Sequence, residues 1–368
     1  MNQTNSQAKN QVVLIGGGHT HALVLNDLKK QPLDGAHITV INPGTTAPYS
    51  GMLPGFVAGH YSRKELDIDL HALTQKVGAE LIDGRAVAID PDKKIITLED
   101  DTSVSYHLAS VDVGITSRMQ SLQGFSEYAV PAKPLGTYSS RWDEFRSSTG
   151  LKNVVVIGGG IAGAELAMAM AFALRREAQT TTVTLLDRST ILSSNSAKTQ
   201  KRVRKALEEN NVKVMEGVNV TEVTSSGINL ANGATIDASF IVGAAGATPH
   251  AWLKDTGLTL VDGFIEVSNI LQSSDPNIFA VGDCAHMSFD PRPKAGVYAV
   301  RQAPVLLNNI RKRLTNVELD AYSPQTDYLK LVSLGGKKAF GEKNGISLSG
   351  HLMWRLKNYI DRKCMNQF

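Results

Sequence analysis

Apolar positions follow two patterns along the chain: short runs of β-branched residues, and longer segments with helical spacing. One short run, Val154 to Ile157, predicts a buried strand; an Ala-, Leu- and Met-rich helix follows it, before a second strand at Val183 to Leu186. The turn between strand and helix reads Gly158-Gly159-Gly160-Ile161-Ala162-Gly163. Strand, glycine turn, helix and strand in this order predict a parallel βαβ unit.

The same order of elements occurs earlier in the chain. A strand at Val12 to Ile15 leads into Gly16-Gly17-Gly18-His19-Thr20-His21, a helix extends to about Lys30, and a strand ends at Asn42. In such units the glycines allow a tight turn, a close approach of pyrophosphate and close packing of helix on strand. Two units imply two nucleotides, most economically one bound flavin and one transient nicotinamide.

Strand-like alternation with turn residues follows each unit, over 79–113 and 212–241, and predicts two inserted β-meanders. Each meander ends in a glycine-containing segment, at Gly114 and at Gly246, so the chain looks internally duplicated. From about Tyr322 the pattern changes to a hairpin around Gly335-Gly336 and a final helix.

Composition limits the classes of function. The chain has 368 residues, enough for two or three domains, and its 42% hydrophobic and 20% charged residues are typical of a globular protein. A net charge of +3 without a basic-aromatic motif argues against nucleic acid. The polar start, Met1 to Gln11, does not resemble a signal peptide, and the apolar stretch 154–174 is interrupted by Glu165 and the glycine turn. We therefore expect a cytoplasmic protein.

The two cysteines, Cys284 and Cys364, form no C-x-x-C pattern, so neither a structural disulfide nor a metal site is predicted. A flavin enzyme that reduces disulfides needs a redox cysteine pair beside the flavin, and none stands near the first glycine unit. His19-x-His21 has no further ligands nearby and does not predict a metal site either.

Other positions have the chemistry of a flavin site. Asp283 follows an apolar strand, where a carboxylate can accept hydrogen bonds from ribityl hydroxyls, and the helix after Lys294 points a positive dipole end at the flavin. Lys133, between two prolines, either reaches the flavin ring or is an exposed lysine. The Gly- and Pro-rich loop around Ser50 and Gly51 either borders the flavin or is a plain connector.

Three stretches resemble a known family: Gly16-Gly17-Gly18-His19-Thr20-His21-Ala22, Pro48-Tyr49-Ser50-Gly51-Met52-Leu53-Pro54-Gly55 and Lys294-Ala295-Gly296-Val297-Tyr298-Ala299-Val300-Arg301-Gln302. With the Gly282-Asp283 pair, they resemble the FAD-dependent pyridine nucleotide-disulfide oxidoreductases. The likeness is to the type II NADH dehydrogenase branch, which lacks the disulfide, and within it to the oxidoreductase module found fused to selenide, water dikinase. It spans Val12 to about Met365.

The resemblance implies an α/β fold with two Rossmann-like, glutathione-reductase-like domains, inserted β-meanders and a small C-terminal α+β region. Expected boundaries are 11–116 with 270–320 for FAD, 117–269 for NAD(P)H with its connecting segment, and 321–368 for an interface or membrane-surface region. Positions expected at FAD are Gly16, Gly18, His19, Thr20, Asn42, Ser50, Gly51, Val87, Gly114, Gly282, Asp283, Lys294, Ala295 and Val297; those expected at NAD(P)H are Gly158, Gly160, Ile161, Gly163, Asp187 and Gly246.

The resemblance also assigns Glu165 as a candidate catalytic residue, with a helix-surface carboxylate as the alternative. Lys133 is the second catalytic candidate, from its position between two prolines and not from the resemblance. Two positions depart from the family pattern, because His21 replaces a small residue and Asn42 replaces the usual ribose-binding Glu. Asn42 can still hydrogen-bond a ribose hydroxyl, without charge. Asp187 favours NADH, although the adjacent Arg188 could accommodate a 2′-phosphate.

The expected activity is hydride transfer from NAD(P)H to FAD, then electron transfer to a quinone-like acceptor. Alternatives are a reductase for another small molecule or a carrier protein, and a regulatory protein that binds flavin and nucleotide without turnover. The final helix, 351–363, is basic and amphipathic, so it either lies on the inner face of a membrane or packs on its own domain or on a homodimer partner.

Overall fold

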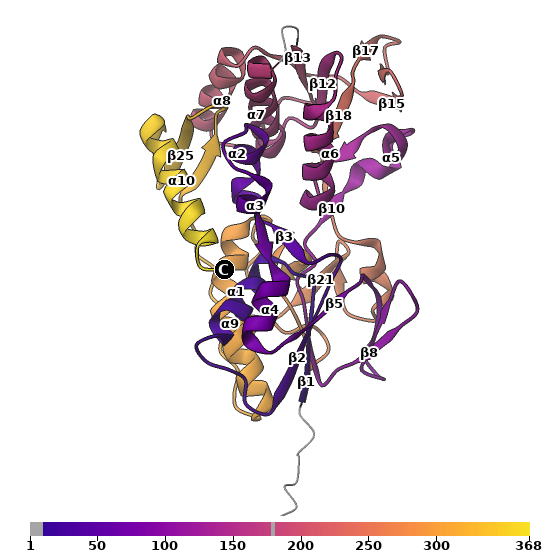
Figure 1. The fold of residues 1–368 in the computed structure, drawn as a ribbon, viewed down its shortest axis with the longest axis vertical. Helices are drawn as coiled ribbons and strands as arrows, with labels where there is room; N and C mark the ends of the chain where they lie inside the picture. The colour runs from indigo at the N-terminus through magenta and orange to yellow at the C-terminus, as the bar shows by residue number, and fades with distance from the viewer. Residues whose placement is uncertain (1–9, 178–180) are drawn as a thin grey trace, which may run out of the picture.

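The computed structural model describes residues 10–177 and 181–368. Figure 1 shows two lobes stacked along the long axis of the molecule, each built around one parallel sheet. The predicted fold class, two Rossmann-like α/β domains, is confirmed. Among the described residues, no helix has both the length and the apolar composition needed to cross a bilayer.

The lower lobe contains the first sheet. Its β1 and β2 are paired in parallel, and their last four residues are buried, as the apolar runs predict. In sheet order the strands are β22 (Ile278–Ala280), β9 (Leu108–Val111), β1 (Asn10–Ile15), β2 (Ala36–Asn42) and β5 (Glu80–Asp83). The helices of this lobe are α1 (His19–Leu28), α4 (Leu70–Val77) and α9 (Gly296–Leu314).

The upper lobe repeats this arrangement. Its sheet is β11 (Val130–Pro131), β18 (Phe240–Gly243), β12 (Lys152–Ile157), β13 (Thr181–Leu186) and β14 (Val212–Met215). The helices around it are α2 (Leu53–Val57), α3 (Arg63–Leu66), α5 (Phe125–Tyr128), α6 (Leu135–Ser147), α7 (Ile161–Glu177) and α8 (Ala197–Glu209).

The predicted meanders are shorter than expected. β5 and β14, at the start of each predicted meander, instead extend the parallel sheets. Alternation of apolar and polar residues is the same in an edge strand of a parallel sheet and in a meander, so pattern alone cannot separate them. The meanders themselves are β6 (Ala86–Asp90), β7 (Ile95–Leu98) and β8 (Ser103–Ser105), and β15 (Val220–Thr224), β16 (Gly227–Leu230) and β17 (Thr235–Asp237).

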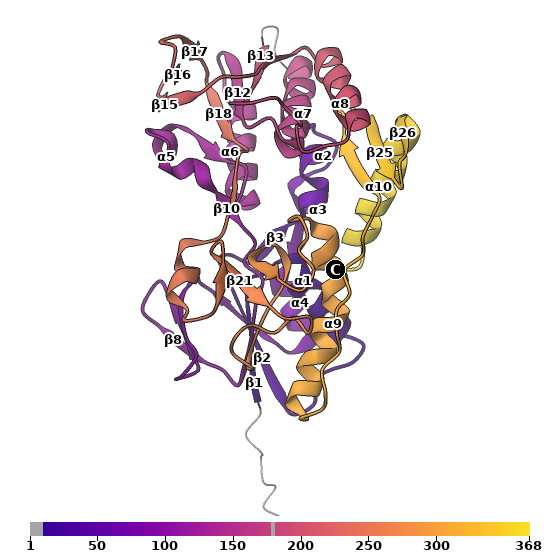
Figure 2. The same cartoon turned by 180° about the vertical axis from the view of Figure 1, so that it is seen from behind.

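The segment 251–267 packs with the first sheet, although the expected boundary at 269 assigned it to the second domain. Leu253, Leu258, Ile265 and Val267 belong to the core of the lower lobe. We therefore place the boundary near 248, where β10 and β19 pair between the lobes (Figure 2). The elements concerned are β10 (Thr116–Ser117), β19 (Ala247–Thr248), β20 (Leu260–Val261), β21 (Phe264–Val267) and β23 (Ala285–Met287).

The C-terminal region is a small sheet with one helix along the side of the upper lobe (Figure 1). The predicted hairpin is present as β24 and β25. The helix α10 buries Met353, Lys357 and Asp361, whereas Leu352 and Tyr359 of its apolar side are exposed. The elements are β24 (Lys330–Ser333), β25 (Ala339–Lys343), β26 (Ile346–Gly350) and α10 (His351–Met365), and the short remaining ones are β3 (Thr46–Pro48), β4 (Asp67–Asp69) and the 3-10 turns at Ser50–Met52, Arg118–Ser121, Ala251–Asp255 and Gly282–Cys284.

Candidate active site

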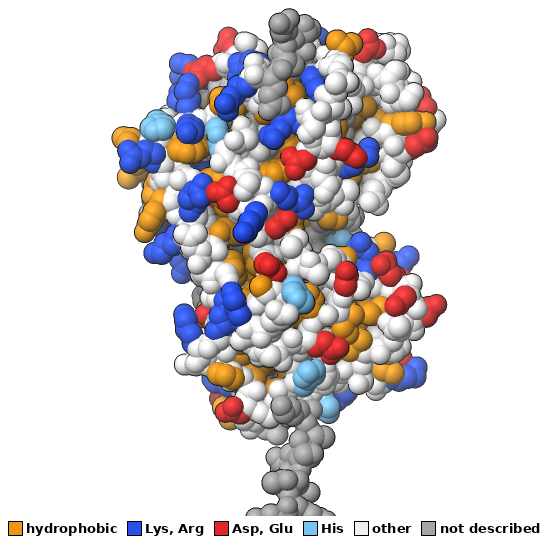
Figure 3. All heavy atoms as spheres, in the orientation of Figure 1, with side chains coloured by type: hydrophobic (Ala, Val, Ile, Leu, Met, Phe, Trp, Pro, Cys, Tyr) orange, Lys and Arg blue, Asp and Glu red, His pale blue; other side chains and the backbone are white. Residues whose placement is uncertain are grey.

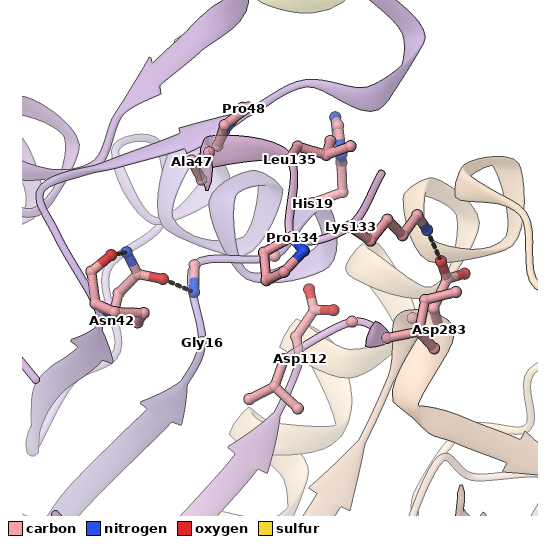
Figure 4. Close-up of a pocket in the computed structure, with 18 of the residues that line it drawn as sticks. Gly16, His19, Asn42, Ala47, Pro48, Asp112, Lys133, Pro134, Leu135 and Asp283 are labelled. Atoms are coloured by element: carbon pink, nitrogen blue, oxygen red, sulfur yellow. Dashed lines mark hydrogen bonds and ion pairs between the residues drawn. The ribbon is translucent and has the colours of Figure 1, made fainter. Parts of the chain in front are cut away.

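A cavity of about 750 Å³ lies between the lobes, bounded by the carboxyl ends of β1, β2 and β9 of the lower lobe and by the start of α6 of the upper lobe (Figure 4). This is where ligands bind in open parallel sheets. Figure 4 shows Asn42 on one side of this space, Lys133 and Asp283 on the other, and the Asp112 carboxyl group between them. The space is therefore bounded by polar groups from segments far apart in the sequence.

The first glycine turn can exist only with glycine at its start. Gly16 has a φ of +92°, and a Cβ atom there would lie 2.4 Å from the backbone oxygen of Asp112. Both the backbone conformation and the close approach of β9 exclude a larger residue. The turn leads into α1, whose first residue is His19.

Asn42 holds this turn from within the protein. Its Oδ1 accepts a hydrogen bond from the Gly17 N–H at 2.8 Å, and its Nδ2 donates to the backbone oxygens of Pro43 and Gly44. The amide thus fixes the loop after β2 against the glycine turn. Its predicted contact with a ribose hydroxyl stays a prediction.

Asp112, which the sequence reasoning passed over, is the most unusual group in the cavity. Its Oδ2 accepts hydrogen bonds from the backbone N–H groups of Thr20 at 2.9 Å and His21 at 3.2 Å, at the start of α1. Burial raises the pKa of the Asp112 carboxyl to about 7, against these hydrogen bonds. An acidic residue at the end of the apolar strand β9 was the signal that could have identified it.

The two histidines of the turn are neutral groups with different roles. His21 is fully buried, with Nδ1 bonded to the Gly16 oxygen at 2.7 Å and Nε2 to Ser110 Oγ at 2.8 Å. His19 lines the cavity, and its buried Nε2 has no hydrogen-bond partner in the described part of the chain. Burial lowers the pKa of both rings to about 4. His21 therefore stabilises the turn through its two hydrogen bonds and does not line the cavity.

Positive charge lies opposite the glycine turn. Lys133 Nζ lies 2.9 Å from Asp283 Oδ2, in a partly exposed ion pair drawn in Figure 4. Lys294 donates to the backbone oxygen of Ala285 and lies over the Phe264 ring, 4.0 Å from its centroid. Lys133 lines the cavity, which is required if it reaches the flavin ring, the first of the two alternatives predicted for it.

Most positions predicted to contact FAD line this one cavity: Gly16, Gly18, His19, Asn42, Ser50, Gly114, Gly282, Asp283, Lys294 and Ala295, together with Lys133. Thr20, Gly51, Val87 and Val297 do not line it. Val87 lies at a register shift between β6 and β7, next to lining residues. Lining residues that sequence reasoning missed include Asp112, Arg63, Arg85, His250 and Trp252.

The second glycine turn has the same internal support as the first. The Gly159 N–H donates to Asp187 Oδ2 at 2.6 Å, as Gly17 does to Asn42. A Cβ atom on Gly163 would lie 1.9 Å from the Gly158 oxygen, whereas Gly160 is exposed with no atom near its Cβ position. The space beside Gly160 is therefore free for a ligand. Ile161 is the first residue of α7, and Gly246 packs against Arg118.

Glu165 lies at the contact between α7 and the C-terminal region. Its Oε1 accepts a hydrogen bond from the Ser333 N–H at 2.6 Å, and burial raises its pKa to about 7, with the nearby Lys357 opposing the rise. Lys357 pairs with Asp361 at 2.7 Å and donates to the Gly51 oxygen at 2.5 Å. A half-buried carboxyl group and a buried ion pair thus connect α7, α10 and the loop at Ser50.

Comparison with known proteins gives a consistent result. The family described as pyridine nucleotide-disulphide oxidoreductase matches residues 10–303. The chain is 25% identical over 359 residues to the NADH dehydrogenase-like protein YutJ of Bacillus subtilis strain 168, covering 95% of this chain and 96% of that protein.

Two solved structures have the same fold. NDH2 of Plasmodium falciparum in complex with NADH has a TM-score of 0.81 at 13% identity and covers 97% of both chains. The sulfide:quinone oxidoreductase of Aquifex aeolicus has a TM-score of 0.77 at 18% identity, covering 97% of this chain and 92% of that one.

Proposed function

Because the chain belongs to the pyridine nucleotide-disulphide oxidoreductase family, an oxidoreductase family that binds FAD and NAD(P)H, we propose that it takes hydride from NADH and passes the electrons to a quinone. The observation that supports a quinone is the position of α10. The helix contacts the loop at the cavity through Lys357 and carries an exposed apolar side.

The free hydrogen-bond donors of the cavity suit FAD. The N–H groups of Gly18 and His19 stand at the start of α1 with no acceptor in the described part of the chain, which is the arrangement that holds a pyrophosphate. In the proposed complex, Asp283 would accept hydrogen bonds from ribityl hydroxyls and Lys133 would contact the flavin ring, since both residues line the cavity. When bound, FAD supplies two-electron acceptance from a hydride donor and electron release to a second substrate.

The protein's own groups would orient the two substrates and hold protons. Gly158, Gly160 and Gly163 shape the turn for the pyrophosphate of NADH, and Asp187 offers a carboxylate for its ribose. Glu165, with a pKa near 7, can hold or release a proton at the contact of α7 with α10. Cys284 Sγ is buried and donates to backbone oxygens, and Cys364 is remote in sequence, so no disulfide relay is proposed.

The apolar surface of β26 and α10 is proposed to contact a membrane. Ile346, Leu348, Leu352 and Tyr359 are exposed, with Leu352 at 77%, and exposed Arg355 and Lys363 lie on the same helix. Figure 3 shows hydrophobic and basic side chains side by side along this edge. An apolar surface with flanking cations favours an anionic bilayer, where quinones are dissolved.

Removing the charge of Asp187 should change the choice of nicotinamide. In Asp187→Asn the amide oxygen can still accept from Gly159, but repulsion of a 2′-phosphate is lost. We expect the ratio of kcat/KM for NADH over NADPH to fall about tenfold, equivalent to about 1.4 kcal/mol. Asp237→Asn, on an exposed strand of the same lobe, is the control and should leave the ratio unchanged. An unchanged ratio in Asp187→Asn would show that Asp187 does not select the nucleotide.

The acceptor is tested by reoxidising the NADH-reduced, FAD-loaded protein. A soluble quinone should reoxidise the flavin faster than oxygen or a small iron-sulfur carrier protein does, and anionic vesicles containing quinone should accelerate the reaction further. Faster reoxidation by the carrier protein would instead favour the reductase alternative. A flavin that no acceptor reoxidises would favour the regulatory one.

A further inference from the structure

The carboxyl group of Asp112 occupies a position that an anionic ligand would otherwise use. It takes two of the N–H donors at the start of α1, those of Thr20 and His21. The two donors next to them, on the cavity-lining residues Gly18 and His19, have no acceptor in the described part of the chain. A pyrophosphate bound to those free donors would therefore lie beside the Asp112 carboxyl group.

The glycine turn is built around this side chain. A Cβ atom on Gly18 would lie 2.3 Å from Asp112 Cγ, and one on Gly282 would lie 2.4 Å from its Oδ1. Asp112 is only 4% exposed, so it cannot rotate away into water without moving the turn. Its charge must therefore be tolerated in place or neutralised there.

Two negative groups beside each other at one helix start oppose one another, and burial strengthens this repulsion. The repulsion is relieved if the carboxyl group takes up a proton when the pyrophosphate binds. The protonated form can still accept from Thr20 and His21 through its carbonyl oxygen.

We propose that Asp112 couples FAD binding to the uptake of one proton, so that this chain loses affinity for its flavin as the pH rises. The inference rests on the proposed function only in requiring that FAD binds in this cavity. The proton comes from solvent and resides on a carboxyl oxygen of Asp112. The site thereby becomes a sensor of pH as well as a cofactor site.

Among the titratable groups around Asp112, none with a shifted pKa changes charge near neutral pH as Asp112 does. The pKa values of His19 and His21 are lowered to about 4, so both rings are neutral. Burial raises the pKa of the Cys284 thiol to about 12. Asp283 adds negative charge that raises the pKa of Asp112 further. The Asp283 carboxylate is paired with Lys133, and Lys294 lines the same cavity.

The direction in which FAD affinity changes with pH follows from the linkage between ligand binding and proton binding. A group that binds a proton more tightly in the complex than in the free protein makes ligand affinity fall with rising pH. Above the pKa of free Asp112, full coupling raises the Kd for FAD about tenfold for each pH unit.

The Kd for FAD can be measured by titrating FAD into the full chain after its flavin has been removed. The titration is followed by flavin fluorescence at several pH values between about pH 6 and pH 8.5. The wild type should lose affinity about tenfold per unit in the upper half of this range, and Asp112→Asn should bind more tightly there with a flat profile. Asp69→Asn, which changes an exposed carboxylate capping α4, is the matched control and should keep the wild-type slope.

Calorimetric titrations in two buffers of different ionisation enthalpy count the protons directly and need no variant. The wild type should take up close to one proton per FAD at the alkaline end, and Asp112→Asn none. A pH-independent Kd without proton uptake in the wild type would overturn the inference while leaving the proposed function intact. Absence of FAD binding at every pH would instead defeat the proposed function.

Discussion

Replacing Gly160 with alanine is expected to raise the KM for NADH by about tenfold or more without destabilising the protein. Gly160 is exposed, and a Cβ atom there meets no protein atom within 4 Å. The free protein therefore accepts alanine. The added methyl group occupies the space through which the pyrophosphate would approach the backbone, so the loss falls on the nucleotide alone.

The comparison variant is Gly163→Ala. Its Cβ atom would lie 1.9 Å from the Gly158 oxygen, so α7 must move away from the sheet and thermal stability must fall. In Gly160→Ala, by contrast, the unfolding temperature, the FAD content and the rate of flavin reduction by dithionite should all stay at wild-type values. An unchanged KM for NADH would show that the nucleotide does not use this turn.

Replacing Lys357 with methionine is expected to lower the free energy of unfolding by about 3–5 kcal/mol, because it leaves the buried Asp361 carboxylate without its partner. The two side chains are 10% and 6% exposed and 2.7 Å apart. The Gly51 oxygen also loses its donor. We expect α10 to detach before the rest of the chain, which hydrogen exchange would detect, and quinone reduction to fall with it.

Lys363→Met is the control, because it removes an exposed lysine from the same helix and should change the unfolding free energy little. The double variant Lys357→Met with Asp361→Leu removes both charges and should recover much of the loss. Equal stability of Lys357→Met and wild type would mean that the ion pair does not hold α10 in place.

The sequence predicted those features that local chain chemistry determines. The two glycine turns, their helices and the acidic or amide residue after each second strand could be placed because turn geometry restricts the residues at Gly16 and Gly163. The carboxyl ends of parallel strands then bring Gly114 and Asp283 to the same cavity as Gly16. The repeated pattern predicted the parallel βαβ units, whereas the order of the strands in each sheet was not predicted.

What could not be predicted depends on contacts between distant segments. Asp112 was not singled out in the sequence, and its role appears only when the end of β9 lies against the start of α1. The final helix showed its apolar period, but periodicity does not say which side packs. The structure buries Lys357 and Asp361 and leaves Leu352 and Leu356 exposed, since the buried charges find partners across the fold.

Hydride transfer from NADH to the flavin is tested most directly by anaerobic mixing of the FAD-loaded protein with NADH while the visible absorbance of the flavin is followed. If the protein is an NADH:quinone oxidoreductase, the flavin bleaches within the time of one turnover, faster with NADH than with NADPH, and its colour returns when quinone is added. A flavin that keeps its colour with both nucleotides, or a protein that retains no flavin, would contradict the proposed activity.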